Sequence, residues 1–203
     1  MTNVLKNWRK FIKENEKMEF PYQIYCDMDG VLVDFAKGLL QATHQDTTNT
    51  DKQKAVYKIM ASGKDFNVFK NDPVLAKGLK HIYKVLNRNK EFWVSLPMKE
   101  DAQQLWSFLA PFDPYVLSAP WDKDSSEGKL IWIREHLVPQ PEKVFLTHDK
   151  FKYAYNKETN LPNILIDDME KYYIPWENAG GIAIHHVSTE DTIKKLQQLI
   201  RGD

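Results

Sequence analysis

The sequence predicts an α/β protein in which a parallel sheet carries helices on both faces, and three observations lead to this fold class. Short apolar runs recur along the 203 residues and end in polar residues, which is typical of buried strands. Amphipathic stretches with helical spacing separate these runs, and such alternation predicts a Rossmann-like arrangement. A long helical stretch after the first strand contains no strand of its own, so we expect a small helical cap inserted there.

Residues 1–20 are expected to form an amphipathic helix. Its apolar face consists of Val4, Leu5, Trp8, Phe11 and Ile12. A helix with one apolar stripe usually buries that stripe against a neighbouring element. We therefore expect it to pack on the main domain, with a partner-binding or membrane-surface helix as the alternative.

The first strand is expected at Tyr22–Cys26, and two carboxylates, Asp27 and Asp29, follow it directly. Gly30 then allows a sharp turn into the next helix. The helical pattern that follows is too long for a simple crossover connection. The expected parts of the chain are an amino-terminal helix (1–20), a core (21–34 and 93–203) and a helical cap insertion (35–92).

The alternation of strands and helices resumes after the cap. Later strands are expected at 115–117, 143–147, 163–166 and 182–184. Later helices are expected at 100–109, at 125–137, in a stretch through Trp176 that stops at Gly180, and after the capping segment 188–191. This order of elements predicts a parallel sheet.

Composition excludes several classes of protein. Lys and Arg number 28 and balance 28 Asp and Glu, so extended nucleic acid is not an expected partner, because its binding depends on phosphate neutralisation. The single cysteine, Cys26, excludes an internal disulfide framework and a cysteine-based zinc site. Neither a membrane-spanning run nor a signal-peptide block is visible, which predicts a cytoplasmic location without membrane contact.

Polar side chains follow the strands at the points where they end. They are Asp27 and Asp29, Ser118, Asp149 and Lys150, and Asp167 and Asp168. Because the carboxyl ends of parallel strands meet at one edge of a sheet, these groups are expected to lie close together. Carboxylates, a hydroxyl and an ammonium at one edge predict a site for an anion and a divalent cation.

These groups suit phosphoryl transfer. Asp27 and Asp167 can supply the oxygen ligands that Mg²⁺ prefers. An aspartate can also attack phosphorus, and Asp29 can protonate the leaving oxygen and later deprotonate water. Lys150 and Ser118 can hold the phosphoryl oxygens. The residues could therefore serve phosphoryl transfer at a site that holds a divalent cation.

The ordered set Asp27-Met28-Asp29-Gly30-Val31, Ser118, Lys150 and Asp167-Asp168 resembles the motifs of the haloacid dehalogenase-like (HAD) phosphatases. Within that superfamily the chain is most similar to the 5'(3')-deoxyribonucleotidases. The segments that carry this likeness are Asp29–Phe35, Gly128–Ile133, Phe145–Lys150, Ile164–Asp168 and Trp176–Gly181.

The resemblance implies Asp27 as the nucleophile and Asp29 as the acid/base. It implies a Mg²⁺ ion held by Asp27, the backbone carbonyl of Asp29 and Asp167. It also implies phosphate binding by Ser118 and Lys150, with Lys129 as a second contributor. Dehalogenases of the superfamily lack the second aspartate, so Asp29 argues against carbon–halogen chemistry.

The likeness also implies a small nucleotide substrate enclosed between cap and core, and it suggests a homodimer. The aromatic residues that could stack on a base are Phe35, Phe66, Phe69 and Trp93; packing between cap and core is the alternative for each. The tyrosines near the expected rim, which we expect to pack in loops rather than contact substrate, are Tyr153, Tyr155, Tyr172 and Tyr173. His148 stands where these nucleotidases often have Arg, and residues 151–162 form a longer stretch than usual.

The leading hypothesis is a Mg²⁺-dependent phosphatase that acts on (deoxy)ribonucleoside monophosphates through an aspartyl-phosphate. One alternative is a phosphatase for another small phosphate ester or for a nucleic-acid 3'-phosphate end. Another alternative is a non-catalytic module that binds a nucleotide or a partner.

Overall fold

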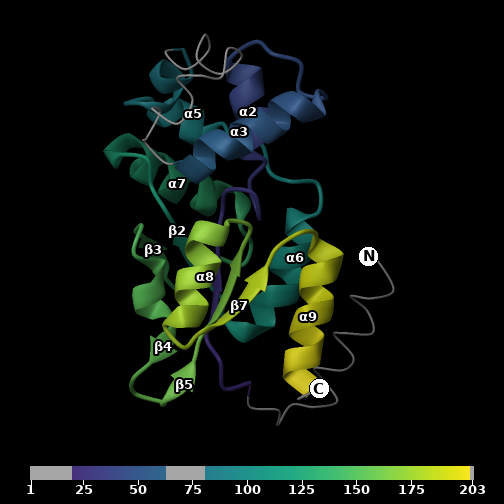
Figure 1. The fold of residues 1–203 in the computed structure, drawn as a ribbon, viewed down its shortest axis with the longest axis vertical. Coiled ribbons are helices and arrows are strands. Elements are labelled where there is room, and N and C mark those ends of the chain that lie inside the picture. Colours follow the sequence, from purple (N-terminus) through teal and green to yellow (C-terminus); the bar gives the residue numbers. More distant parts are fainter. Residues whose placement is uncertain (1–19, 63–80, 202–203) are drawn as a thin grey trace.

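Figure 1 shows the computed structural model, which describes residues 20–62 and 81–201. A five-stranded sheet with the strand order β3-β2-β1-β6-β7 forms its centre. Its strands are β1 (Ile24–Cys26), β2 (Tyr115–Ser118), β3 (Val144–Leu146), β6 (Ile164–Asp167) and β7 (Ile182–His185). Each strand pairs in parallel with its neighbours, which confirms the predicted fold class.

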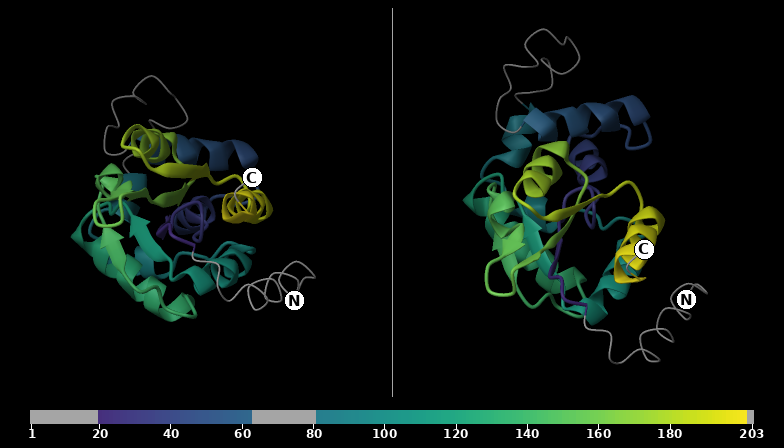
Figure 2. Two further views of the ribbon diagram at one scale, coloured as in Figure 1. Left: turned by 90° about the horizontal axis from the view of Figure 1, so that it is seen from below. Right: turned by 60° about the horizontal axis from the view of Figure 1, so that its bottom comes forward.

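Helices cover both faces of the sheet, as Figure 2 shows from two further directions. The helices of the core are α6 (Ala102–Leu109), α7 (Lys123–His136), α8 (Glu170–Asn178) and α9 (Thr189–Arg201). On one face, Ile24 and Cys26 pack in the same cluster as Trp106 of α6. On the other face, Tyr25 packs with Trp176 of α8. Successive strand residues point to opposite faces, so β1 contributes to both layers of the core.

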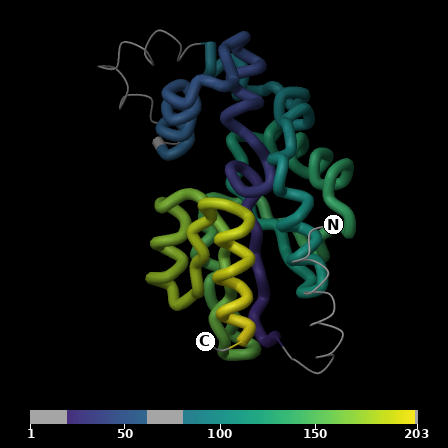
Figure 3. The backbone as a smooth tube through the Cα atoms, turned by 90° about the vertical axis from the view of Figure 1, so that its right-hand side faces the viewer, coloured from purple at the N-terminus to yellow at the C-terminus, as the bar shows by residue number. Residues whose placement is uncertain are grey.

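The cap helices lie beyond the carboxyl ends of the strands, at the upper end of the molecule in Figures 1 and 3. They are α2 (Phe35–Ala42), α3 (Thr50–Ser62) and α5 (Lys90–Val94). Asp34 caps α2 by accepting a hydrogen bond of 3.0 Å from the backbone of Lys37. The boundary predicted at residue 93 falls inside α5, and that helix packs closely on α7. A Cβ added at Gly128 of α7 would lie 2.5 Å from the Cβ of Trp93, so the close crossing requires glycine there.

The chain enters and leaves the cap at one place. Val33 forms an antiparallel bridge with Met98. The backbone N–H of Asp34 donates to the carbonyl of Pro97 at 2.8 Å, and that of Lys99 donates to the carbonyl of Leu32 at 3.0 Å. The two connections between core and cap are therefore held side by side.

Two local features differ from the sequence expectations. The stretch 151–162 contains the 3₁₀ turn η3 (Lys150–Tyr153) and an antiparallel ribbon of β4 (Tyr155–Asn156) and β5 (Leu161–Pro162). The ribbon strands have two residues each, too few to show an alternating pattern. Helix α7 begins before Ser125, because Asp122 caps it. The Asp122 carboxylate accepts from the backbone N–H of Ser125 at 2.8 Å, and Oγ of Ser125 accepts from the backbone N–H of Asp122 at 2.7 Å.

The expected amino-terminal helix and the aromatic candidates Phe66 and Phe69 lie outside the described residues. Within residues 20–62 and 81–201, no helix has the length and apolar character needed to cross a membrane.

Candidate active site

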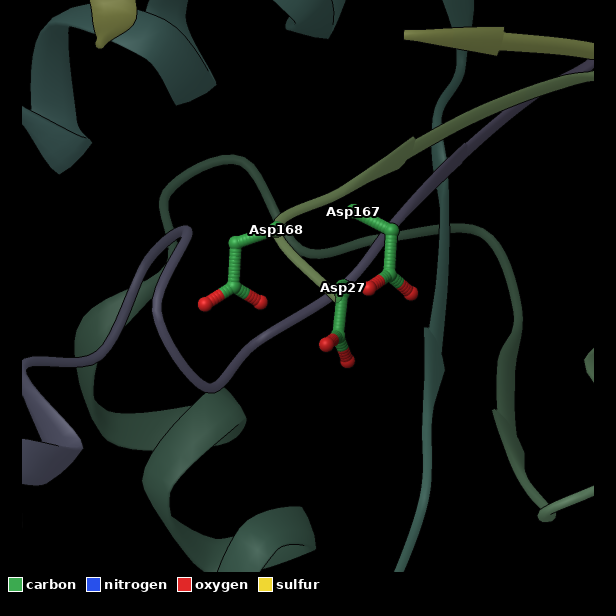
Figure 4. Close-up of side chains that lie close together, drawn as sticks. All are labelled: Asp27, Asp167 and Asp168. Carbon is green, nitrogen blue, oxygen red and sulfur yellow. The ribbon is translucent and has the colours of Figure 1, made fainter. Parts of the chain in front are cut away.

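Three carboxyl groups meet where β1 and β6 end (Figure 4). Asp27 directly follows β1, and its backbone N–H donates to the carbonyl of Ile166 at 2.9 Å. Asp167 is the last residue of β6, and Asp168 follows it. One oxygen atom from each of these three residues lies within 4.8 Å of the others. The structure thus adds Asp168 to the predicted pair of Asp27 and Asp167.

The turn after Asp27 is closed by backbone hydrogen bonds to Met28. The N–H groups of Leu32 and Val33 both donate to the carbonyl of Met28 at 2.8 Å. Gly30 has a φ of 81°, which a side chain would disfavour. A Cβ at that position would also lie 2.0 Å from Oδ2 of Asp168. Gly30 therefore allows both the sharp turn and the approach of the third carboxylate.

Lys150 lies between two of these carboxylates and is fully buried, at 1% exposed. Its Nζ is 3.0 Å from Oδ1 of Asp27 and 2.6 Å from Oδ2 of Asp167. Burial alone would lower the pKa of Lys150, but Asp167 and Asp27 raise it above its usual value. The ammonium therefore stays charged and offsets the negative charge of the cluster.

A second buried lysine serves the other aspartate. Nζ of Lys129, on α7, is 2.5 Å from Oδ2 of Asp29 and donates to Oγ of Ser118 at 3.0 Å. Lys129 is completely buried, so this ion pair is little screened by solvent. The structure thus brings the sequence-predicted residues Asp27, Asp29, Ser118, Lys129, Lys150 and Asp167 to one edge of the sheet.

Burial and mutual repulsion raise the pKa values of the carboxyl groups. The pKa of Asp167 rises to about 6, because burial and the charge of Asp27 outweigh the opposing effect of Lys150. Burial, with the charges of Asp27 and Asp167, raises the pKa of Asp168 well above its usual value. Burial also raises the pKa of Asp29, despite Lys129. Ionisation of all of these carboxyl groups together is therefore unfavourable without a further cation.

This donor set fits a hard divalent cation. Oδ1 of Asp168 and Oδ1 of Asp29 are buried and have no hydrogen-bond partner among the described residues. Unpaired buried oxygens are costly unless an ion or water satisfies them. Asp27, Asp167 and Asp168 supply the carboxylate oxygens that Mg²⁺ accepts, so they would hold the ion.

We expect the metal-free protein to lose stability as the pH rises from about 4 to about 6. A carboxyl group with a raised pKa in the folded state favours folding only while it is protonated, and its ionisation through this window costs roughly 3 kcal/mol for Asp167. Mg²⁺ should offset this cost, so it should raise the melting temperature more at pH 7 than at pH 5.

Thermal unfolding with EDTA and with Mg²⁺ across this range would measure the effect. Asp167→Asn is the matched variant, and it should reduce both the pH dependence and the gain from Mg²⁺. An equal gain from Mg²⁺ at both pH values would contradict the expectation.

A cavity of about 70 Å³ lies between this edge of the sheet and the cap. Asp27 and Asp29 form part of its wall. Phe35 and Trp93 line it from the cap side, with ring centroids 5.6 Å apart. Both are almost fully buried, so they pack cap against core and also face the predicted substrate space.

Further residues of the cavity wall come from the core. They are Trp121, His148, Met169, Lys171 and Tyr172. Lys171 also bonds the core to the cap, because its Nζ donates to the carbonyl of Met60 in α3 at 2.5 Å. Tyr172, which the sequence predicts to pack in a loop, lies on α8 and lines the cavity. The sequence feature that could have indicated this is its position five residues after Asp167, in the first turns of the helix that leaves the site.

No family model matches the chain. A protein of Vibrio phage KVP40, named "Putative 5'(3')-deoxyribonucleotidase", is 25% identical over 177 residues, which are 84% of this chain and 79% of the phage protein.

Two solved structures are similar along nearly their whole length. A hydrolase from Streptococcus pneumoniae TIGR4 has a TM-score of 0.54 and 14% identity, with 89% of this chain and 98% of that chain covered. The "putative HAD-hydrolase YfnB from Bacillus subtilis", bound to magnesium, has a TM-score of 0.53, with the same identity and coverage. The chain has the HAD-like fold. The residues described above thus lie at the carboxyl edge of a HAD-like core, beneath its cap.

Proposed function

We propose that this protein is a Mg²⁺-dependent phosphatase that acts on (deoxy)ribonucleoside monophosphates. The observation that carries the proposal is the shared cavity of Asp27 and Asp29, each paired with its own buried lysine and adjacent to a cluster of three carboxylates. Hydrolysis of a phosphate monoester needs a nucleophile, an acid/base, cationic groups and a metal site close together, and this site offers a candidate for each.

In the proposed reaction the Asp27 carboxylate attacks phosphorus and forms an aspartyl-phosphate. Asp29 donates a proton to the leaving oxygen and then takes one from the water that hydrolyses this intermediate. Mg²⁺ bound at the carboxylate cluster would neutralise charge between the carboxylates and the phosphoryl group.

In the proposed reaction three buried side chains would hold the phosphoryl oxygens. Lys150 and Lys129 offer ammonium hydrogens. Ser118 accepts a hydrogen bond from Lys129, so its hydroxyl hydrogen is available to donate to an oxygen of the substrate. These groups would stabilise the charge that develops in the transition state.

The cavity and the comparisons support a small nucleotide as the substrate. Phe35 and Trp93 offer aromatic surface for a base, and Lys171 lies at the same wall. A small cavity between cap and core favours a small substrate over a long polymer. The name of the phage relative agrees with this substrate class. The homodimer and the cytoplasmic location stay predictions.

Release of inorganic phosphate from a panel of deoxy- and ribonucleoside monophosphates, with Mg²⁺ and with EDTA, tests the proposal. A sugar phosphate and a 3'-phosphorylated oligonucleotide belong in the same panel. We expect Mg²⁺-dependent release from the mononucleotides and little from the oligonucleotide. Faster release from the sugar phosphate or the oligonucleotide would show that this class is the substrate instead. Nucleotide binding without phosphate release would indicate a binding module.

A further inference from the structure

The ring of Tyr172 lies against two lysine side chains at the wall of the cavity. Nζ of Lys150 lies 4.4 Å from the centroid of that ring, and Nζ of Lys171 lies 5.0 Å from it. Tyr172 also lines the cavity together with Asp27 and Asp29. The ring of Tyr172 is thus contacted by the buried lysine of the carboxylate cluster and by the lysine that bonds the core to the cap.

The ammonium of Lys150 needs such support. Two of its three hydrogens can point to Asp27 and Asp167, at 3.0 and 2.6 Å. A cation bound to the same carboxylates would weaken both of these contacts. Among the described residues, the ring of Tyr172 is the remaining contact of Lys150 that such a cation would leave intact. The ring attracts the ammonium through its quadrupole and not through a carboxylate oxygen.

We propose that Tyr172 is a positioning residue, which holds the Lys150 ammonium beneath the phosphoryl group and keeps water from that end of the cavity. The proposal rests on the proposed function, in which Lys150 binds phosphate. Tyr172 acts through Lys150 and takes no part in proton transfer.

The adjacent Tyr173 provides a matched control. It lies on the same helix, but its ring stacks on His185 with the centroids 4.8 Å apart. It is not part of the cavity wall. A loss of general packing in α8 should affect variants at both positions, whereas a loss of Lys150 positioning should affect only those at Tyr172.

The experiment compares Tyr172→Phe, Tyr172→Leu and Tyr173→Leu in the full-length, Mg²⁺-loaded protein. Calorimetry gives the affinity for inorganic phosphate, and kinetics give kcat and KM separately. We expect Tyr172→Leu to weaken phosphate binding roughly 2- to 30-fold, the range of cation–π contacts from exposed to desolvated sites. Tyr172→Phe keeps the ring and should restore wild-type affinity, and Tyr173→Leu should bind phosphate as the wild type does. Equal losses in the Phe and Leu variants, or unchanged binding in the Leu variant, would overturn the proposal.

Crystal structures of the two Tyr172 variants separate this inference from the proposed function. In the Phe variant Lys150 should remain between Asp27 and Asp167, and in the Leu variant it should leave one of them. The same Lys150 position in both variants would refute the positioning role even in an active phosphatase. A wild type that neither binds phosphate nor releases it would instead refute the proposed function.

Discussion

Asp27→Asn is expected to abolish phosphate release, by roughly four orders of magnitude or more, while the fold stays intact. The amide has nearly the same shape as the carboxylate but cannot form the aspartyl-phosphate. The site should remain assembled, because Lys150 keeps its contact of 2.6 Å with Asp167. Initial rates on the best substrate of the panel would measure the loss, and circular dichroism would check the fold.

Asp149→Asn is the control for Asp27→Asn. Asp149 precedes Lys150 in the chain, but its side chain is exposed and pairs with Lys152 at 2.6 Å. The rate of phosphate release by Asp149→Asn should match that of the wild type. Substantial residual release by Asp27→Asn would remove Asp27 as the nucleophile, and trapping of a phosphorylated residue elsewhere would then identify the group that replaces it.

Lys150→Met should both stop turnover and destabilise the metal-free protein. The substitution leaves the carboxylates of Asp27 and Asp167 buried without their shared cation, and breaking a buried pair in this way typically costs about 3–5 kcal/mol. Mg²⁺ should recover part of that stability, because it occupies the same carboxylates. Chemical denaturation with EDTA and with Mg²⁺ would give both free energies of unfolding.

The control for Lys150→Met is Lys152→Met, two residues along the same turn. Lys152 pairs with Asp149 at the surface, where ion pairs contribute little. We expect its stability to be unchanged in either buffer. If Lys150→Met unfolds at the wild-type denaturant concentration in EDTA, then the carboxylates are not held charged, and Lys150 does not act as their counter-ion.

Much of the core could be predicted because buried parallel strands are short and almost wholly apolar. The runs around Ile24, Leu117 and Ile166 show this pattern, and the carboxyl ends of the strands then determine which polar residues meet. The prediction of Asp27, Ser118 and Asp167 at one edge follows from that geometry alone.

The pairings within the site could not be predicted, since they depend on packing between distant segments. Lys129 and Asp29 are 100 residues apart in the sequence, and their pairing depends on where α7 lies in the fold. Asp168 joins the carboxylate cluster because Gly30 leaves room for it. The resemblance named Phe35 and Trp93 as candidates, but their mutual contact could not be predicted, because it depends on how the cap packs on the core.

The paired crossings at Val33 and Met98 have a consequence for evolution and for protein engineering. Everything between Asp34 and Pro97 leaves and rejoins the core at adjacent positions, joined by a backbone hydrogen bond of 2.8 Å. An insert of any length can therefore be exchanged there if its two ends lie a few ångströms apart. The strand ends that carry Asp27, Ser118 and Asp167 lie outside the exchanged segment, so a transplanted cap that keeps the packing of Trp93 against Gly128 would change the cavity wall and leave these strand ends in place.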